Sequence, residues 1–269
     1  MVGKWHWGVT GAGTATVISQ AISVLLCAFW IRKRIPALQP ERKEWRIDRH
    51  LLKETVSSGA LTALQQAAQP VGKLMIQSVI NAQGVITVDA FNAVCRVDDF
   101  ACIPAQSIGH SMMTCVAQNR GAGQWDRVRR TLLTGLCMGI CYFPLIFALT
   151  QLLKQPVITW LSPESDGERI VAEGVRYLTL AAWFFIYPCV LNALQGYLRG
   201  LGKMSIVLLG TCIQIGIRAL CVYLLVPRIG IIGEAWGCMA GWSCQLVFEF
   251  FYYTFVLKIW HAPGSGKTI

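Results

Sequence analysis

The sequence predicts an all-α, polytopic membrane protein with about seven transmembrane helices. Its 269 residues are 54% hydrophobic and only 14% charged, and the mean hydropathy is +0.49. These values are too apolar for an ordinary soluble domain. Apolar runs of about 20 residues, long enough to cross a hydrocarbon core of about 30 Å, recur along the whole chain. The candidate spans are 8–31, 55–80, 88–117, 131–153, 174–198, 205–226 and 231–257.

The second span is interrupted by polar residues at regular intervals. Gln65, Gln69, Lys73 and Gln77 are spaced four residues apart, which places them in one stripe along a helix. Because lipid cannot satisfy such groups, we expect the stripe to face a partner helix or an aqueous cavity.

The third span carries the most charge. Arg96 and Asp99 share a helix face with Asn92, so Arg96 can pair with Asp99. Asp98 points about 100° away and has no evident local partner. Because an ionised side chain deep in a bilayer costs roughly 2.5 kcal/mol or more, such residues often mark an ion or substrate path. We interpret Arg96, Asp98 and Asp99 as candidates for cation or proton coupling; the alternative is a partly hydrated acidic pair holding Lys73 or Arg96.

Two further residues of this span are weaker candidates. Pro104 removes a backbone hydrogen bond, which predicts either a hinge or a static kink. His110 is suited to proton exchange, although a lone histidine beside serines is more often hydrogen-bonded packing. Asn92, His110 and the stripe of the second span are the cavity-lining candidates.

Isolated charges in the later spans are less informative. Glu234 begins the last span and is interpreted as a cap or helix-dipole residue. Glu249 lies deeper and could reach Lys258 only by extending along the helix. Arg218 calls for a partner that the sequence does not identify.

Lys and Arg gather in alternate loops, which predicts the orientation. They crowd the segments after the first, third and fifth spans, whereas the intervening loops carry few cations. The C-terminus is therefore predicted to be cytoplasmic and the N-terminus external. The formal net charge of +10 reflects this topology rather than a nucleic-acid partner. The basic segments are 32–53, 120–130 and 199–203.

Two loop motifs resemble those of a known family. The strings Gln118-Asn119-Arg120-Gly121-Ala122-Gly123 and Leu198-Arg199-Gly200-Leu201-Gly202 look like the cytoplasmic loops after the eighth and tenth helices of multidrug and toxic compound extrusion (MATE) transporters. Gly121 and Gly123 are predicted to permit positive φ and a tight reversal. The segments 8–34, 93–104 and 227–242 are similar to the family's sixth helix, the start of its eighth, and the loop and start of its twelfth.

The resemblance implies half of a two-lobed transporter. Residues 1–34 would be the family's sixth helix, 35–54 a basic cytoplasmic linker, 55–258 the C-terminal six-helix lobe and 259–269 a cytoplasmic tail. The missing N-terminal lobe, or a second half-molecule, is then an expected partner. The family's location implies a plasma membrane of the bacterial inner-membrane type.

The activity that the resemblance implies is antiport of H+ or Na+ against organic cationic small molecules by alternating access. Some family members carry a glutamate at the position of Gln69 and an aspartate at the position of Pro188, so these departures put a sodium site in doubt. Two alternatives remain open. One is an exporter of lipid-linked oligosaccharides or other polyanions, favoured by Lys73, Arg96 and Arg218; the other is a gene fragment that does not transport.

Catalytic and metal-binding patterns are not found. The 11 cysteines are spread singly, and the 4 histidines are widely spaced, so neither a zinc site nor a nucleophile with its base is predicted. We expect no enzyme activity, no cofactor and no metal site, and the lipid bilayer as the surrounding partner.

Overall fold

The computed structural model describes residues 8–34, 47–161 and 167–257. In these ranges every regular element is a helix, which confirms the predicted all-α class. The predicted tail 259–269 and most of the linker 35–54 lie outside the described residues. The elements are α2 (Gly8–Arg34), α3 (Arg49–Asn81), α4 (Val85–Gly121), α5 (Trp125–Leu161), α6 (Gly167–Phe184), α7 (Ile186–Gly200), α8 (Met204–Ile229), α9 (Ile232–Phe251) and a π-helical turn η2 (Tyr252–Leu257).

Each predicted span corresponds to a helix or to a pair of helices, since α6 and α7 together make the fifth. The chain divides into two compact units, Met1–Glu54 and Thr55–Ile269. The first unit holds α2, and the second holds nearly all of α3 and every later helix.

Three described helices are long and apolar enough to cross a membrane by composition alone. They are Gly13–Arg34 within α2, α5 and α8, and the bent pair of α6 and α7 makes a fourth if it counts as one span. Neither α3 nor α4 passes this test, because glutamines and charges interrupt their apolar runs.

A bend of 45° separates α6 from α7 at Phe185. Pro188 lies one turn later and has no N–H, so the carbonyl of Phe184 loses its usual helical donor. The backbone tightens there, with the Phe185 N–H bonding to the Ala182 carbonyl three residues back. Pro188 therefore accounts for the break that the hydropathy pattern does not show.

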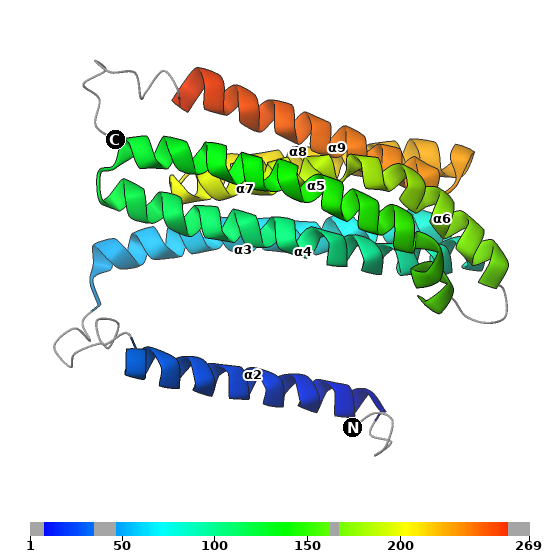
Figure 1. The fold of residues 1–269 in the computed structure, drawn as a ribbon, viewed down its shortest axis with the longest axis horizontal. Coiled ribbons are helices and arrows are strands. Elements are labelled where there is room, and N and C mark those ends of the chain that lie inside the picture. Colours follow the sequence, from blue (N-terminus) through cyan, green and yellow to red (C-terminus); the bar gives the residue numbers. More distant parts are fainter. Residues whose placement is uncertain (1–7, 35–46, 162–166, 258–269) are drawn as a thin grey trace. The chain divides into compact units, whose positions relative to one another are not determined.

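Glycines allow α4 and α7 to approach closely within the second unit (Figure 1). A Cβ added to Gly196 would lie 2.2 Å from the carbonyl oxygen of Gly109, and one added to Gly109 would lie 2.6 Å from the carbonyl oxygen of Asn192. Small residues at such crossings are typical of helix packing in membranes.

The α8–α9 pair uses the same device. Gly233, Gly237 and Gly241 recur every four residues on α9 and face the α8 backbone. A Cβ on Gly241 would lie 2.7 Å from the carbonyl oxygen of Gln214. These contacts hold the middle of α8 directly against α9.

The turns after α4 and α7 lie at one end of the second unit, which we call the basic end. Both turns contain the sequence Arg-Gly-x-Gly, and their second glycines, Gly123 and Gly202, have φ of 70° and 73°. Gly121 is the last residue of α4, and its φ is not positive. The prediction of positive φ at Gly121 is therefore wrong. Arg120 Nη1 joins the two turns by donating to the Leu201 carbonyl at 2.6 Å.

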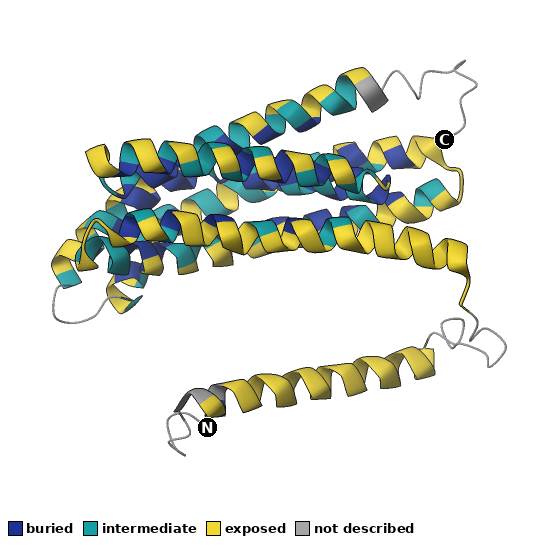
Figure 2. Cartoon of the chain, turned by 180° about the vertical axis from the view of Figure 1, so that it is seen from behind, coloured by how far each residue is buried: buried dark blue, intermediate teal, exposed yellow. Residues whose placement is uncertain are grey.

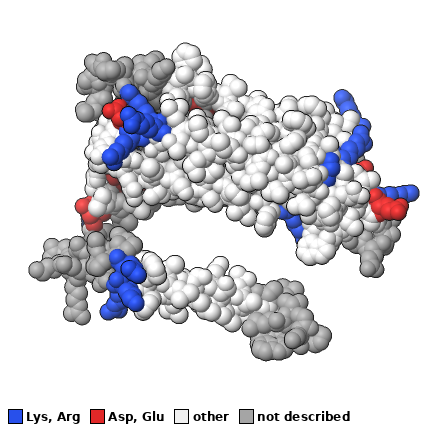
Figure 3. All heavy atoms as spheres, viewed as in Figure 1, with Lys and Arg blue, Asp and Glu red and all other residues white. Residues whose placement is uncertain are grey.

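Buried residues lie on the inward faces of the helices of the second unit (Figure 2). One apolar cluster, which includes Ile80, Tyr177 and Ile231, lies toward the end opposite the basic end. Another, which includes Val116, Tyr197 and Leu201, lies toward the basic end. On the face shown in Figure 3, Lys and Arg of this unit gather near the two ends, and the surface between them is largely uncharged.

Candidate functional site

A group of charged and polar side chains, part of it buried, lies among the helices of the second unit, away from the basic end. We call it the charged cluster. It draws on α3, α4, α6, α8 and α9, and its members are Lys73, Asp98, Asp99, Tyr177, Arg218, Glu234 and Cys238.

Glu234 is the fully buried member, at 0% exposure. Arg218 forms an ion pair with its Oε1, and the Arg218 Nε donates to the same oxygen at 3.1 Å. Tyr177 Oη donates to Oε2, and Cys238 Sγ donates to Oε1 at 3.0 Å. Both carboxylate oxygens are therefore satisfied, as a buried charge requires.

Glu234 is thus more than a cap residue, and the sequence interpretation of it is corrected. Arg218 lies beside Gly237 and Gly241, and its side chain reaches along α9 to Glu234. The partner that the sequence could not identify for Arg218 is this carboxylate.

Asp99 pairs with Lys73 of α3. The Lys73 Nζ lies 2.9 Å from Oδ1 and 3.2 Å from Oδ2 of Asp99, and both side chains are exposed in this chain. The predicted pairing of Asp99 with Arg96 is therefore wrong. Arg96 is exposed and forms no ion pair within the described residues. Lys73 of the neighbouring helix α3 occupies Asp99 in its place.

Asp98 differs from both other carboxylates. Its Oδ1 is buried and has no hydrogen-bond partner in the described part of the chain. Glu234, Arg218, Asp99 and Lys73 all act on it electrostatically. The cluster thus contains three carboxylates and two cations, and Asp98 is the carboxylate that no direct partner neutralises.

The stripe predicted on α3 separates into different environments. Gln65 is buried, Gln69 and Lys73 are exposed, and Gln77 is partly buried and donates to Asn81. Only Lys73 belongs to the charged cluster.

The remaining candidates of α4 lie elsewhere on that helix. Asn92 and His110 are exposed. Pro104 lies within a continuous helix, and Tyr142 Oη donates to the carbonyl of Ala101 at 2.9 Å, one turn before it. Their roles in lining a cavity and in hinge motion stay predictions.

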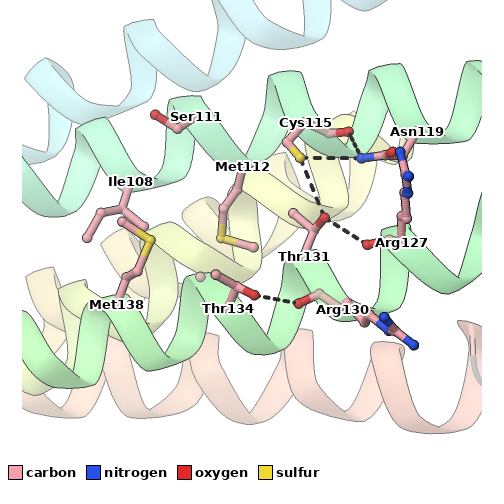
Figure 4. Close-up of a pocket in the computed structure, with 11 residues that line it drawn as sticks. Ile108, Ser111, Met112, Cys115, Asn119, Arg127, Arg130, Thr131, Thr134 and Met138 are labelled. Carbon is pink, nitrogen blue, oxygen red and sulfur yellow. Dashed lines mark hydrogen bonds between the residues drawn. The ribbon is translucent and has the colours of Figure 1, made fainter.

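A pocket of about 430 Å³ opens between α4 and α5 (Figure 4). Ile108, Met112 and Met138 make one end apolar, while Asn119 and Arg127 lie toward the basic end. Asn119 donates to the carbonyl of Cys115 at 2.8 Å, so it stabilises the last turns of α4. The charged cluster does not line this pocket.

A second polar group lies near the basic end, and we call it the amide cluster. Sequence reasoning named Gln65, Arg199 and Glu249 separately but missed the group, because its members come from four helices. Its hydrogen bonds run from Arg199 to Gln65 and Gln195, from Gln65 to Thr211, and from Gln245 to Glu249. The motif residue Arg199 therefore enters the bundle, while Gly200 packs against Val116 of α4 and Gln118 remains in the last turn of that helix.

The fold and these clusters define a polytopic helical membrane protein with charged side chains inside its bundle. Residues 62–224 match the MatE family. The chain belongs to this family of MATE transporters, which are not enzymes.

The chain is similar to several members of the family. It is 29% identical over 209 residues to "Probable multidrug resistance protein YpnP" of Bacillus subtilis, covering 77% of this chain and 45% of that protein. It is 23% identical over 267 residues to "Probable multidrug resistance protein YoeA" of the same species, covering 96% and 56%. The chain spans about half the length of these curated relatives.

Solved structures show the same fold. The "Crystal structure of MATE in complex with MaL6" superposes with a TM-score of 0.84 at 17% identity, covering 93% of this chain and 57% of that chain. The resemblance drawn from the two loop motifs is thus confirmed at the level of family and fold.

Proposed function

We propose that this chain forms half of a two-lobed transporter that exports organic cations in exchange for H+ or Na+ by alternating access. The observation that carries the proposal is the charge balance of the charged cluster. Arg218 pairs with Glu234 and Lys73 contacts Asp99, whereas Asp98 keeps a buried oxygen that no described residue contacts by a hydrogen bond. An unneutralised carboxylate inside a membrane protein is suited to binding an incoming cation.

A proton fits Asp98 better than a sodium ion. Hard metal cations bind through several oxygen ligands. Thiols lie near Asp98 instead, since Cys95, about one turn before it on α4, and Cys102, about one turn after it, both interact with it electrostatically. A proton needs only the free Oδ1, so we favour H+ as the coupling ion.

In this mechanism, a proton arriving from outside occupies Asp98 and removes one negative charge from the cluster. The loss of charge weakens the attraction for a cationic substrate and favours the rearrangement of the two lobes. The exposed Gln69, Asn92, Arg96 and His110 would line the cavity between this lobe and its partner.

A polyanion exporter is the second candidate, and the ion pairs count against it. Of the three cations that favoured it, Lys73 and Arg218 each contact a carboxylate. Only Arg96 is left to attract an anionic cargo. A gene fragment that does not transport is the remaining alternative, and it predicts no activity in any pairing of lobes.

The location follows from family and charge. We propose a plasma membrane of the bacterial inner-membrane type, with the basic end and the C-terminus in the cytoplasm. The partner would be an N-terminal lobe or a second half-molecule. In this arrangement residues 55–258 act as one lobe and 1–34 as a separate helix.

Ethidium efflux from right-side-out vesicles under an imposed pH gradient, acidic outside, would test the proposal. The chain would be fused behind the N-terminal half of the Bacillus subtilis relative that is 29% identical. We expect Asp98→Asn to abolish efflux driven by the gradient. Asp126→Asn, the same change at an exposed aspartate in the first turn of α5, should leave it largely intact. Undiminished efflux in an Asp98→Asn, Asp99→Asn variant would reject the assignment of Asp98 as the coupling group. If the unmodified fusion showed no efflux, the alternative of a gene fragment that does not transport would be favoured.

A further inference from the structure

Two carboxylates on α9 are equally buried but have different surroundings. Glu234 and Glu249 are both 0% exposed. They lie about four turns apart on the same helix, one in the charged cluster and one in the amide cluster. A buried carboxylate needs a counter-charge or a proton. Glu234 has the counter-charge of Arg218.

Glu249 lacks the partners that Glu234 has. Its Oε1 accepts a hydrogen bond from the neutral Gln245 amide at 2.9 Å, and the neutral Gln195 amide of α7 also acts on the carboxyl group. Its Oε2 is buried and has no partner within the described residues. The α8 backbone closes one side of the carboxylate, since a Cβ on Gly210 would lie 2.8 Å from Oε1.

Charged neighbours do not neutralise Glu249 in this arrangement. The neighbouring groups are neutral on α8 (Gly210), on α9 (Gln245) and on α7 (Gln195), and among the described residues Arg199 on α7 is the charged group that acts on it. Arg199, however, donates from Nη2 to Gln65 at 3.2 Å and to Gln195 at 3.1 Å. Its Nε is buried and has no partner in the described part of the chain.

We propose that Glu249 binds a proton on Oε2 and that the amide cluster is a second proton site, separate from the charged cluster. The proton removes the charge of Glu249 where no cation contacts it, whereas Arg218 compensates the charge of an ionised Glu234. The inference does not depend on Asp98 or on the cargo, because it rests only on contacts within this lobe.

Arg199 and the proton compete for Glu249. When the proton leaves for water, a carboxylate remains, and Arg199 is the cation that can pair with it. Moving toward Oε2 would weaken the bonds that Arg199 makes to Gln65 on α3 and Gln195 on α7. Because Gln65 also donates to Thr211 on α8 at 3.0 Å, proton occupancy is linked to the contacts between α3, α7 and α8 at the basic end.

Infrared spectroscopy of the purified 269-residue chain in lipid nanodiscs tests this directly, because only a protonated carboxyl gives a C=O stretch distinct from carboxylate. We expect a buried carboxyl band near neutral pH, and Glu249→Gln should remove one component of it. The control Glu54→Gln changes an exposed glutamate and should leave the band unaltered. Asp98→Asn reports on the charged cluster. A band component that disappears in Asp98→Asn but not in Glu249→Gln belongs to Asp98 and bears on the coupling proposal, not on Glu249.

Two more variants guard against misfolding and test the role of Arg199. Glu249→Asp keeps a carboxyl and should shift the component rather than remove it, with circular dichroism confirming helix content. In Arg199→Gln the Glu249 carboxyl band should persist to pH values at which the unmodified chain has lost it, because no cation is then available to replace the proton. In Arg199→Lys, which keeps a cation, the band should again disappear as it does in the unmodified chain. If Glu249→Gln and the unmodified chain gave identical spectra at every pH, Glu249 would be ionised and the proposal overturned.

Discussion

Arg218 on α8 and Glu234 on α9 form an ion pair inside the bundle, with the carboxylate fully buried and the Arg218 side chain only 18% exposed. The pair joins two helices whose backbones meet at Gly237 and Gly241. Because both oxygens of Glu234 are occupied, it is a structural element beside Asp98 rather than a free acceptor. Arg218 and Glu234 therefore stabilise the lobe, and Asp98 is the group that we propose for coupling.

Breaking the Arg218–Glu234 pair at one partner should destabilise the lobe strongly. Glu234→Gln leaves a buried guanidinium without a counter-charge, which costs about 3–5 kcal/mol. Replacing both residues, Arg218→Met with Glu234→Leu, should cost much less, because no charge is left unpaired. A double-mutant cycle on unfolding in mixed micelles checks this, and equal losses in the single and double variants would contradict it.

The Lys73–Asp99 pair should contribute little to stability by contrast. Its side chains are 57% and 66% exposed in this chain, and exposed pairs contribute about 0–1 kcal/mol. Lys73→Gln and Asp99→Asn should each change the free energy of unfolding by less than about 1 kcal/mol. A loss as large as that of Glu234→Gln would show that the pair is buried in the folded chain.

The crossing of α4 and α7 should not accept a methyl group at Gly196. The added Cβ would meet backbone 2.2 Å away, at the Gly109 carbonyl oxygen, and overpacking of this kind costs about 1–3 kcal/mol. Gly216 on α8 is a matched control, since a Cβ there meets nothing within 4 Å. Gly216→Ala should be neutral or stabilising by up to about 1 kcal/mol, and thermal unfolding in detergent should separate the two variants.

The two glycines of the α4–α5 turn should respond differently to alanine. Gly123 has φ of 70°, so Gly123→Ala should cost about 1–2 kcal/mol. Gly121 is helical and a Cβ there meets nothing within 4 Å. Gly121→Ala should therefore leave unfolding unchanged or improve it, and similar losses at both positions would show that the turn needs both glycines.

Much of the fold could be predicted from the sequence, because long apolar runs leave few structures open to a chain in lipid. Every predicted span is helical, and the helices that fall short of the apolarity expected of a membrane crossing are α3, α4 and α9, whose apolar runs are interrupted by polar or charged residues. The break at Phe185 was missed, although Pro188 was its signal. A proline in an apolar run does not by itself say whether a helix kinks or ends.

The site could be predicted only in part, because charge inside a span is visible in sequence but its partner is not. Lys73, Asp98 and Asp99 were found as candidates from their position alone. The pairing of Asp99 with Lys73 rather than Arg96, and of Arg218 with Glu234, joins residues on different helices. Local spacing favours partners one turn away, and it was misleading wherever a neighbouring helix offered a closer one.

The sequence by itself determined that this chain is a helical membrane protein of the MATE type with charges inside its spans, because hydropathy and short loop motifs are local properties. Only the tertiary structure decided how each buried charge is neutralised. Burial removes water, and the groups that replace it depend on which helices lie alongside: Glu234 has the Arg218 cation of α8, whereas Glu249 has a hydrogen bond from the neutral Gln245 of its own helix. That difference between two glutamates of one helix depends on packing, which no single segment encodes.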